Sequence, residues 1–177
     1  GVWRDNRYPG AACDVPSHFY SFSFALNPYW SKTYANQPEI LSYLETVATD
    51  HGLDDHLVTG TRVTTLRWSD ETRRWSVTTA HGVVHEFDVI VTAVGMLDVP
   101  NIPDIPGAEG FRGRAFHSSN WDHSTSTAGE RVACIGTGAS AVQYVPAIAA
   151  ETTHLAVFQR TPIWVAPRVD EPFTAEQ

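Results

Sequence analysis

The amino-acid sequence predicts an α/β fold: an antiparallel β-meander and a buried strand, followed by the start of a doubly wound, Rossmann-like parallel sheet. Three observations predict it. Short strand-like runs alternate with polar breaks over residues 61–87. A nearly continuous apolar run follows at residues 88–93, as in a strand buried on both faces of a sheet. From Arg131, a strand, a glycine turn, a helix and another strand follow one another, which is one βαβ unit of a parallel sheet.

The first 50 residues combine an irregular segment with one helix. Residues 1–38 are rich in aromatics, Pro, Ser and Asn without a sustained period, which is typical of loops wrapped over a ligand or core. A helix should open at Gln37-Pro38-Glu39, because proline suits an early helical position and apolar residues recur on one face as far as Ala48. Gly52 is expected to end this helix.

The middle of the chain predicts strands and then a stiff connector. Three runs with strand character should form a small antiparallel meander, at residues 61–68, 75–79 and 83–87. The apolar strand at 88–93 should end at Gly95. Residues 99–107 contain three prolines, each of which fixes φ and removes a hydrogen-bond donor, so an extended connector is expected there.

The composition excludes several classes of partner. The 177-residue chain has a formal charge of −8 and a pI near 5.4, which argues against nucleic acid. The two cysteines, Cys13 and Cys134, are too few for a disulfide scaffold and have no metal-ligand spacing. No apolar run approaches the roughly 20 residues of a membrane helix. We therefore expect a soluble, cytoplasmic protein without a membrane partner, and no metal site.

A glycine motif predicts dinucleotide binding. Gly136-x-Gly138-x-x-Ala141 lies between a strand at 132–135 and a helix at 141–150, where small residues let the backbone approach a pyrophosphate. The helix N-terminus then presents free N–H groups to that anion. An ordinary tight turn between strand and helix is the alternative.

The end of the next strand indicates the coenzyme. After the strand at 155–158, an NAD-specific unit would usually place Asp or Glu, whereas this chain has Arg160-Thr161. Arg160 can pair with a 2′-phosphate and Thr161 can donate another hydrogen bond, which favours NADPH over NADH. A solvated surface arginine is the alternative.

Upstream of this unit lies a spaced motif, Phe111-x-Gly113-x-x-x-His117-x-x-x-Trp121-Asp122. Physical chemistry alone predicts a turn with one titratable imidazole and an aromatic anchor. Taken in isolation, His117 is more typical of a hydrogen-bonded structural histidine than of a catalytic one.

This segment resembles, at every fixed position, the fingerprint of Baeyer–Villiger monooxygenases, F-x-G-x-x-x-H-x-x-x-W followed by Pro or Asp. Related N- or S-oxidising flavin monooxygenases typically end the motif with Tyr or Phe, so Trp121 favours the Baeyer–Villiger type. Further stretches are similar and occur in the family's order, among them residues 6–11, 37–41, 131–132, 135–138 and 157–162.

The resemblance implies two cofactors, FAD and NADPH, and places their contacts. The positions implied for FAD are Val2, Trp3, Asp14, Tyr20 and Val63. Those implied for NADPH are Gly136, Thr137, Gly138, Ala139, Ser140, Arg160 and Thr161. Two residues are implied in catalysis: Asp14 would orient an arginine that lies beyond Gln177, and His117 would couple the position of the NADPH domain to the active site.

The resemblance also implies a domain organisation. Residues 1–105 would be a partial FAD-binding domain, doubly wound and Rossmann-like, without its first βαβ element. Residues 106–129 would be a linker with the fingerprint, and residues 130–177 the start of an inserted NADPH-binding Rossmann domain. Three departures bear on the site: Ala12 stands where the family has Arg, Val94 where it has Thr, and Arg4-Asp5 where it has an aromatic pair.

The implied activity of the parent protein is oxidation of a ketone to an ester or lactone with NADPH and O2, through a peroxide of the reduced flavin. The isolated chain is expected to be inactive. The alternatives are an N- or S-oxidising flavin monooxygenase and a catalytically inactive NADPH-binding module. The sequence indicates neither the ketone, nor its regioselectivity, nor an oligomeric state.

Overall fold

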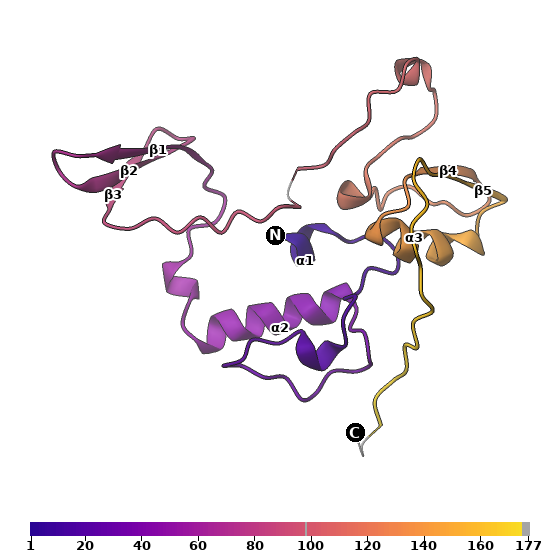
Figure 1. The fold of residues 1–177 in the computed structure, drawn as a ribbon, viewed down its shortest axis with the longest axis horizontal. Helices are drawn as coiled ribbons and strands as arrows, with labels where there is room; N and C mark the ends of the chain where they lie inside the picture. Colours follow the sequence, from indigo (N-terminus) through magenta and orange to yellow (C-terminus); the bar gives the residue numbers. More distant parts are fainter. Residues whose placement is uncertain (98, 175–177) are drawn as a thin grey trace. The chain divides into compact units, whose positions relative to one another are not determined.

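The computed structural model describes residues 1–97 and 99–174. The chain divides into two compact units, each considered by itself (Figure 1). One comprises Ala48–Met96; the other comprises Gly1–Val47 together with the chain from Leu97 onward.

The unit Ala48–Met96 contains the predicted meander. Strands β1 (Val63–Ser69), β2 (Arg74–Thr79) and β3 (Val84–Phe87) form one antiparallel sheet in the order β1-β2-β3. Trp68 and Trp75 face each other across the first strand pair with ring centroids 5.5 Å apart, a cross-strand pair that stabilises the register. The meander expected from the alternating pattern is confirmed.

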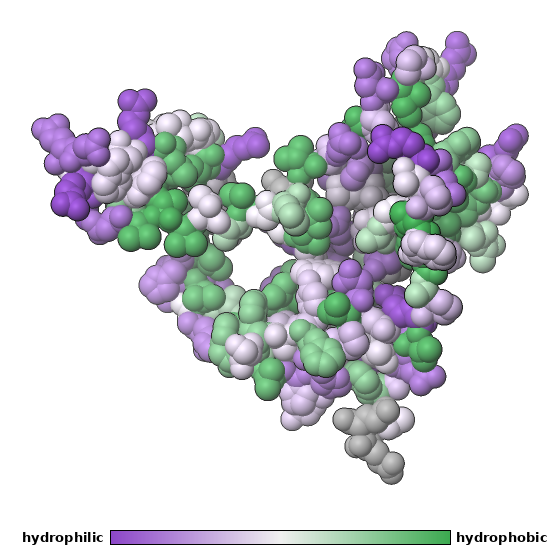
Figure 2. Space-filling view, viewed as in Figure 1, coloured by the Kyte–Doolittle hydropathy of each residue, from purple (hydrophilic) through white to green (hydrophobic). Residues whose placement is uncertain are grey.

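The strand predicted at residues 88–93 is not formed, and this prediction was wrong. The segment has no regular secondary structure, and Val89 and Val91 are 73% and 84% exposed. A central strand needs hydrogen-bonded neighbours on both sides, and within residues 1–97 and 99–174 no strand pairs with it. Figure 2, in which hydrophobic residues are green, shows that many other hydrophobic residues also lie on the surface.

Residues 1–36 are mostly irregular, as predicted for residues 1–38, with a short helix α1 (Val2–Asp5) and a 3₁₀ turn at Ser17–Phe19. Helix α2 (Gln37–Asp50) begins where Pro38 predicts. Its end also matches, because Gly52 has a φ of +64° and the Leu53 N–H donates back to the Ala48 carbonyl at 2.8 Å.

A first core forms around the start of α2. Its fully buried members come from three separate stretches of the N-terminal region and are Cys13, Trp30, Ala35 and Ile40. Half-buried aromatic side chains, including Trp3, Tyr20 and Tyr43, pack against them. The aromatic-rich N-terminal segment is therefore ordered by packing instead of by regular secondary structure.

The C-terminal part forms the predicted βαβ unit. Strand β4 (Arg131–Ile135), helix α3 (Ala139–Ala149) and strand β5 (His154–Phe158) follow in order, and β4 pairs with β5 in parallel with Cys134 opposite Val157 (Figure 1). Helix α3 begins at Ala139, two residues before the predicted start. Two 3₁₀ turns, at Ala108–Gly110 and Ser118–Asn120, lie in the segment between the prolines and β4.

A second core lies under α3. Cys134, Ala141, Tyr144 and Ile148 are its buried members, and Tyr8 and Trp121 pack against it from other parts of the chain. Burial, with a smaller effect of the adjacent Cys134, raises the pKa of Tyr144 to about 12, so its phenol stays neutral at physiological pH.

The chain beyond β5 returns to the N-terminal segment. The Thr33 N–H donates to the Glu171 carbonyl at 2.9 Å, and the Phe173 N–H donates to Ser31 at 3.0 Å. Half-buried Lys32 and exposed Asp170 form an ion pair at 2.7 Å. None of the helices within the described residues combines the length and apolar character that a bilayer span requires.

Candidate functional site

The glycine turn between β4 and α3 has the geometry of an anion site. Gly136 has a φ of +104°, a left-handed conformation that side chains disfavour, and its N–H donates to the Phe158 carbonyl at 2.8 Å. Gly138 is the N-cap of α3, and no side chain caps the helix. The first N–H groups of α3 thus have no intrahelical acceptor and, among the residues that the structure describes, no side-chain partner, which fits a pyrophosphate.

The coenzyme-selecting residues lie at the end of β5. Arg160 and Thr161 follow the last residue of the strand by two and three positions and are exposed. Within the described residues, Arg160 makes no ion pair or hydrogen bond. Its guanidinium is therefore free to meet a 2′-phosphate.

An apolar hollow adjoins the turn. It has a volume of about 260 Å³ and lies between α3 and the chain that leaves β5. Its lining includes Thr137 and Ala141 from the glycine motif, together with Val142, Val145, Pro146, Val157, Gln159, Ile163 and Val165. Of the predicted NADPH residues, Thr137 alone lines it.

The fingerprint is a set of local interactions plus one long-range anchor. Trp121 packs edge-on to Phe116 at 5.2 Å and contacts the ring of Tyr144 on α3 at 5.4 Å. A Cβ added at Gly113 would lie 2.4 Å from the ring of Phe111, so the glycine makes room for that ring.

The polar members of the fingerprint fix its turns. The Asp122 carboxylate accepts from Ser124 N–H at 2.9 Å and from Thr125 Oγ1 at 2.6 Å. The Ser124 hydroxyl also donates to this carboxylate, at 2.5 Å. These hydrogen bonds, that of the Ser124 hydroxyl first, lower the pKa of Asp122. His117 is half-buried, and its Nδ1 accepts from the Ser119 N–H at 3.2 Å, which in the neutral ring leaves the proton on Nε2.

The residues implied for FAD lie in both units. Trp3 and Tyr20 are together: the indole N–H donates to the Tyr20 hydroxyl at 2.9 Å, and the rings meet edge to face at 5.4 Å. Val2 and Asp14 are exposed in the same unit, and the Asp14 carboxylate has no partner among the described residues. Val63 opens β1 in the other unit, with half of its surface exposed.

One contact that sequence reasoning missed joins the Asp14 loop to α3. The Gln143 amide accepts from the Ala12 N–H at 3.3 Å and donates to the Ala12 carbonyl at 2.9 Å. Its oxygen also accepts from the Tyr8 hydroxyl at 3.0 Å. Gln143 and Ala12 are 131 residues apart, so no local sequence pattern indicates that they pair. The one sign of this contact in the sequence was a polar residue on a helix that is otherwise packed on a core.

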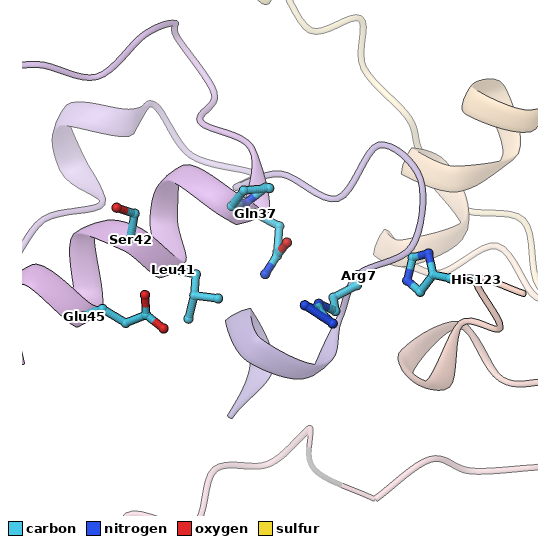
Figure 3. A pocket seen from close by; sticks show the side chains of 7 residues that line it. Arg7, Gln37, Leu41, Ser42, Glu45 and His123 are labelled. Atoms are coloured by element: carbon cyan, nitrogen blue, oxygen red, sulfur yellow. The ribbon is translucent and has the colours of Figure 1, made fainter.

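A larger hollow of about 420 Å³ lies along α2 (Figure 3). Gln37, Leu41, Ser42 and Glu45 line it from the helix, while Arg7 and His123 come from two other segments. None of the predicted site residues lines this hollow, so it is distinct from the glycine turn.

Comparisons with known proteins identify the family of this chain. The model of the flavin-binding monooxygenase-like family matches residues 16–174. A Baeyer–Villiger monooxygenase of Streptomyces coelicolor is 51% identical over all of this chain and 34% of its own length. Another, of Pseudomonas aeruginosa, is 44% identical over 96% of this chain and 32% of its own.

Solved structures of this kind of enzyme have the same fold over the length of this chain. The NADP+-bound cyclohexanone monooxygenase of Rhodococcus sp. Phi1 superposes with a TM-score of 0.92 at 42% identity, over 100% of this chain and 34% of that one. The chain thus spans about a third of the length of these relatives. The resemblance to Baeyer–Villiger monooxygenases and the α/β fold class predicted from the sequence are both confirmed. With a family model that covers residues 16–174, the chain belongs to the flavin-binding monooxygenase-like family.

Proposed function

We propose that this chain supplies the NADPH phosphate site and one side of the flavin site of a Baeyer–Villiger monooxygenase. The observation that carries the proposal is the β4–α3 turn, with its left-handed Gly136 and uncapped helix, followed after β5 by the unpaired Arg160. These groups suit a dinucleotide pyrophosphate and a 2′-phosphate, respectively. The relative bound to NADP+ supports the choice of coenzyme.

The NADPH contacts proposed are Gly136, Thr137, Gly138, Ala139, Ser140, Arg160 and Thr161. Gly138 and Ala139 are exposed, as a contact to a bound pyrophosphate requires. Arg160 would read the 2′-phosphate as a charge-assisted pair, with Thr161 beside it.

The flavin contacts proposed are Val2, Trp3, Asp14, Tyr20 and Val63. The Trp3–Tyr20 pair offers a rigid aromatic edge, and the free Asp14 carboxylate offers a charge. Within the described residues, the β4–α3 turn is the one place where a parallel strand runs into a helix. We propose that residues 1–105 are one part of an FAD domain. The residues that bind the FAD pyrophosphate would belong to another part of that domain, outside this chain.

When bound, FAD would take a hydride from NADPH and activate O2. The overall reaction proposed for the whole protein converts a ketone, O2, NADPH and a proton to an ester or lactone, NADP+ and water. Asp14 would orient an arginine supplied from outside the chain and set the charge beside the flavin. His117 would act through position, because its Nδ1 is engaged in capping its own turn, in a linker at residues 106–129 that precedes the NADPH domain. The 177-residue chain alone would not turn over. Because both cysteines are free thiols, we also propose a cytoplasmic location.

The test uses the full-length protein that contains this chain, supplied with FAD and offered NADPH or NADH and then a ketone, an amine or a sulfide. Reduction of the flavin by NADPH in preference to NADH, with ester formed from the ketone, is the expected result. Oxidation of only the amine or sulfide would show the N- or S-oxidising class instead. Absence of flavin reduction by either coenzyme would reduce the chain to a binding module.

A further inference from the structure

The loop that carries Asp14 lies directly against the helix of the glycine motif. Gly10 has a φ of +78°, and a Cβ there would lie 2.8 Å from the backbone oxygen of Gln143 and 3.4 Å from the Cβ of Ala147. Only a glycine lets the backbone approach α3 so closely. The glycine at position 10 is therefore what allows the Asp14 loop to contact α3.

The Gln143 side chain then fixes the loop in register on the helix. Its amide both accepts from and donates to the backbone of Ala12, which is 6% exposed, two residues before Asp14. The pairing settles the orientation of the amide, since the Ala12 N–H needs an oxygen and the Ala12 carbonyl needs an N–H. Tyr8 adds a third hydrogen bond to the same oxygen.

The same turn of the helix holds the fingerprint. Tyr144, next to Gln143, contacts Trp121 at 5.4 Å and Tyr8 at 6.2 Å between ring centroids. One turn of α3 thus contacts the Asp14 loop through Gln143 and the fingerprint through Tyr144. The N-terminus of this helix is the proposed phosphate site.

We propose that Gln143 is a positioning residue, whose side-chain amide holds the Asp14 loop at a fixed place relative to the NADPH-binding turn. The roles of Asp14 and of the NADPH-binding turn rest on the proposed function. The attachment of the loop to the Gln143 amide, called the clamp below, rests on the three hydrogen bonds alone. Without the amide, the loop should open locally and the coenzyme should still bind, because the Gln143 side chain faces Ala12 and Tyr8 and no residue of the glycine turn.

The first experiment uses the cysteines as reporters in the 177-residue chain. Cys13, 1% exposed, lies next to Ala12, and Cys134, 4% exposed, lies in β4 beneath α3. Labelling by a dithiodipyridine, resolved by peptide mass spectrometry, measures how often each thiol becomes accessible. In Gln143→Met, which keeps the length of the side chain and its helix propensity, Cys13 should react about tenfold faster or more, and Cys134 less than about twofold faster. Equal acceleration of both thiols, or of neither, would overturn a local clamp.

A second variant gives the clamp a signature in pH. In Gln143→Glu, a neutral carboxyl can donate to the Ala12 carbonyl and accept from its N–H, as the amide does, whereas the carboxylate repels that carbonyl. The Cys13 labelling rate, divided by the wild-type rate at the same pH, should therefore fall towards one as the pH is lowered from 8 to 4.5. A ratio that does not change with pH would contradict the donor and acceptor roles assigned to the amide, even if Gln143→Met fails to fold.

The third measurement tests the role in the full-length protein. In Gln143→Met, the rate constant of flavin reduction by NADPH should fall about tenfold or more while the Kd of NADPH changes less than about twofold. Ala149→Gln, at the exposed end of the same helix, is the matched control and should leave both constants unchanged. If the rate constant of flavin reduction in Gln143→Met equals that of the wild type, the positioning role is overturned. No reduction in the wild type would instead overturn the proposed function, and the labelling result would still decide the clamp.

Discussion

Replacing Gly10 by alanine should destabilise the larger unit by more than a left-handed backbone alone explains. The φ of +78° makes any side chain unfavourable there by about 1–2 kcal/mol. The new Cβ would also lie 2.8 Å from the Gln143 carbonyl oxygen, a backbone atom that cannot rotate away. The loop must therefore move off α3, which weakens the three hydrogen bonds of the Gln143 amide, each worth about 0.5–1.5 kcal/mol. Together these losses predict about 2–4 kcal/mol.

Gly129 provides the matched control in the same unit. Its φ is +76°, almost that of Gly10, and a Cβ there would meet nothing within 4 Å. Gly129→Ala should therefore lose only the backbone part, about 1–2 kcal/mol. Urea unfolding of the 177-residue chain, followed by tryptophan fluorescence, measures both, and with a slope of about 1–3 kcal/mol per molar the two midpoints should differ by roughly 1 M. Equal losses in the two variants would refute the close approach of the loop to the helix.

Three further predictions concern the coenzyme and the fingerprint. In the full-length protein, Arg160→Ala should weaken NADPH binding by about 1.5–3 kcal/mol and leave NADH nearly unchanged, measured by coenzyme titration; equal losses would show that Arg160 does not read the 2′-phosphate. His117→Ala should slow NADPH-driven turnover while FAD stays bound, and wild-type turnover in this variant would make the histidine a structural cap only. Hydrogen bonds lower the pKa of Asp122 below its ordinary 3.8, so the ionised form stabilises its turn above that value and the stabilisation is lost as pH falls through the lowered pKa. The protection factor of the Ser124 amide, which is the intrinsic exchange rate divided by the observed rate at the same pH, should accordingly fall at acid pH in the wild type, and an Asp122→Asn variant that shows the same acid dependence would argue against this carboxylate.

Local patterns predicted the elements whose stabilising contacts are close in sequence. Helix α2 follows from Pro38 and Gly52 at its ends, and the meander follows from alternating residues between turns. The βαβ unit was predictable because the glycine turn sets both the end of β4 and the start of α3. In each case, the cause of the structure lies within the element or beside it.

Predictions failed where the cause lies elsewhere. Residues 88–93 have the composition of a central strand, yet composition cannot supply the neighbouring strands with which such a backbone must pair. The clamp between Gln143 and Ala12 joins positions 131 residues apart, and no period along the chain indicates which polar helical residue will find a backbone partner. The fingerprint predicted a turn and an aromatic anchor, but its attachment to Tyr144 required the fold.

The most direct test of the proposed function follows the oxygen atom. The full-length protein, supplied with FAD and NADPH, is given cyclohexanone, the ketone bound in a structurally similar relative, under ¹⁸O2. A Baeyer–Villiger oxidation predicts a lactone that carries one ¹⁸O atom in its ring, with one NADPH consumed for each lactone formed. A flavin that NADPH reduces and O2 reoxidises without any labelled lactone, from this ketone or from a panel of cyclic and linear ketones, would contradict the account.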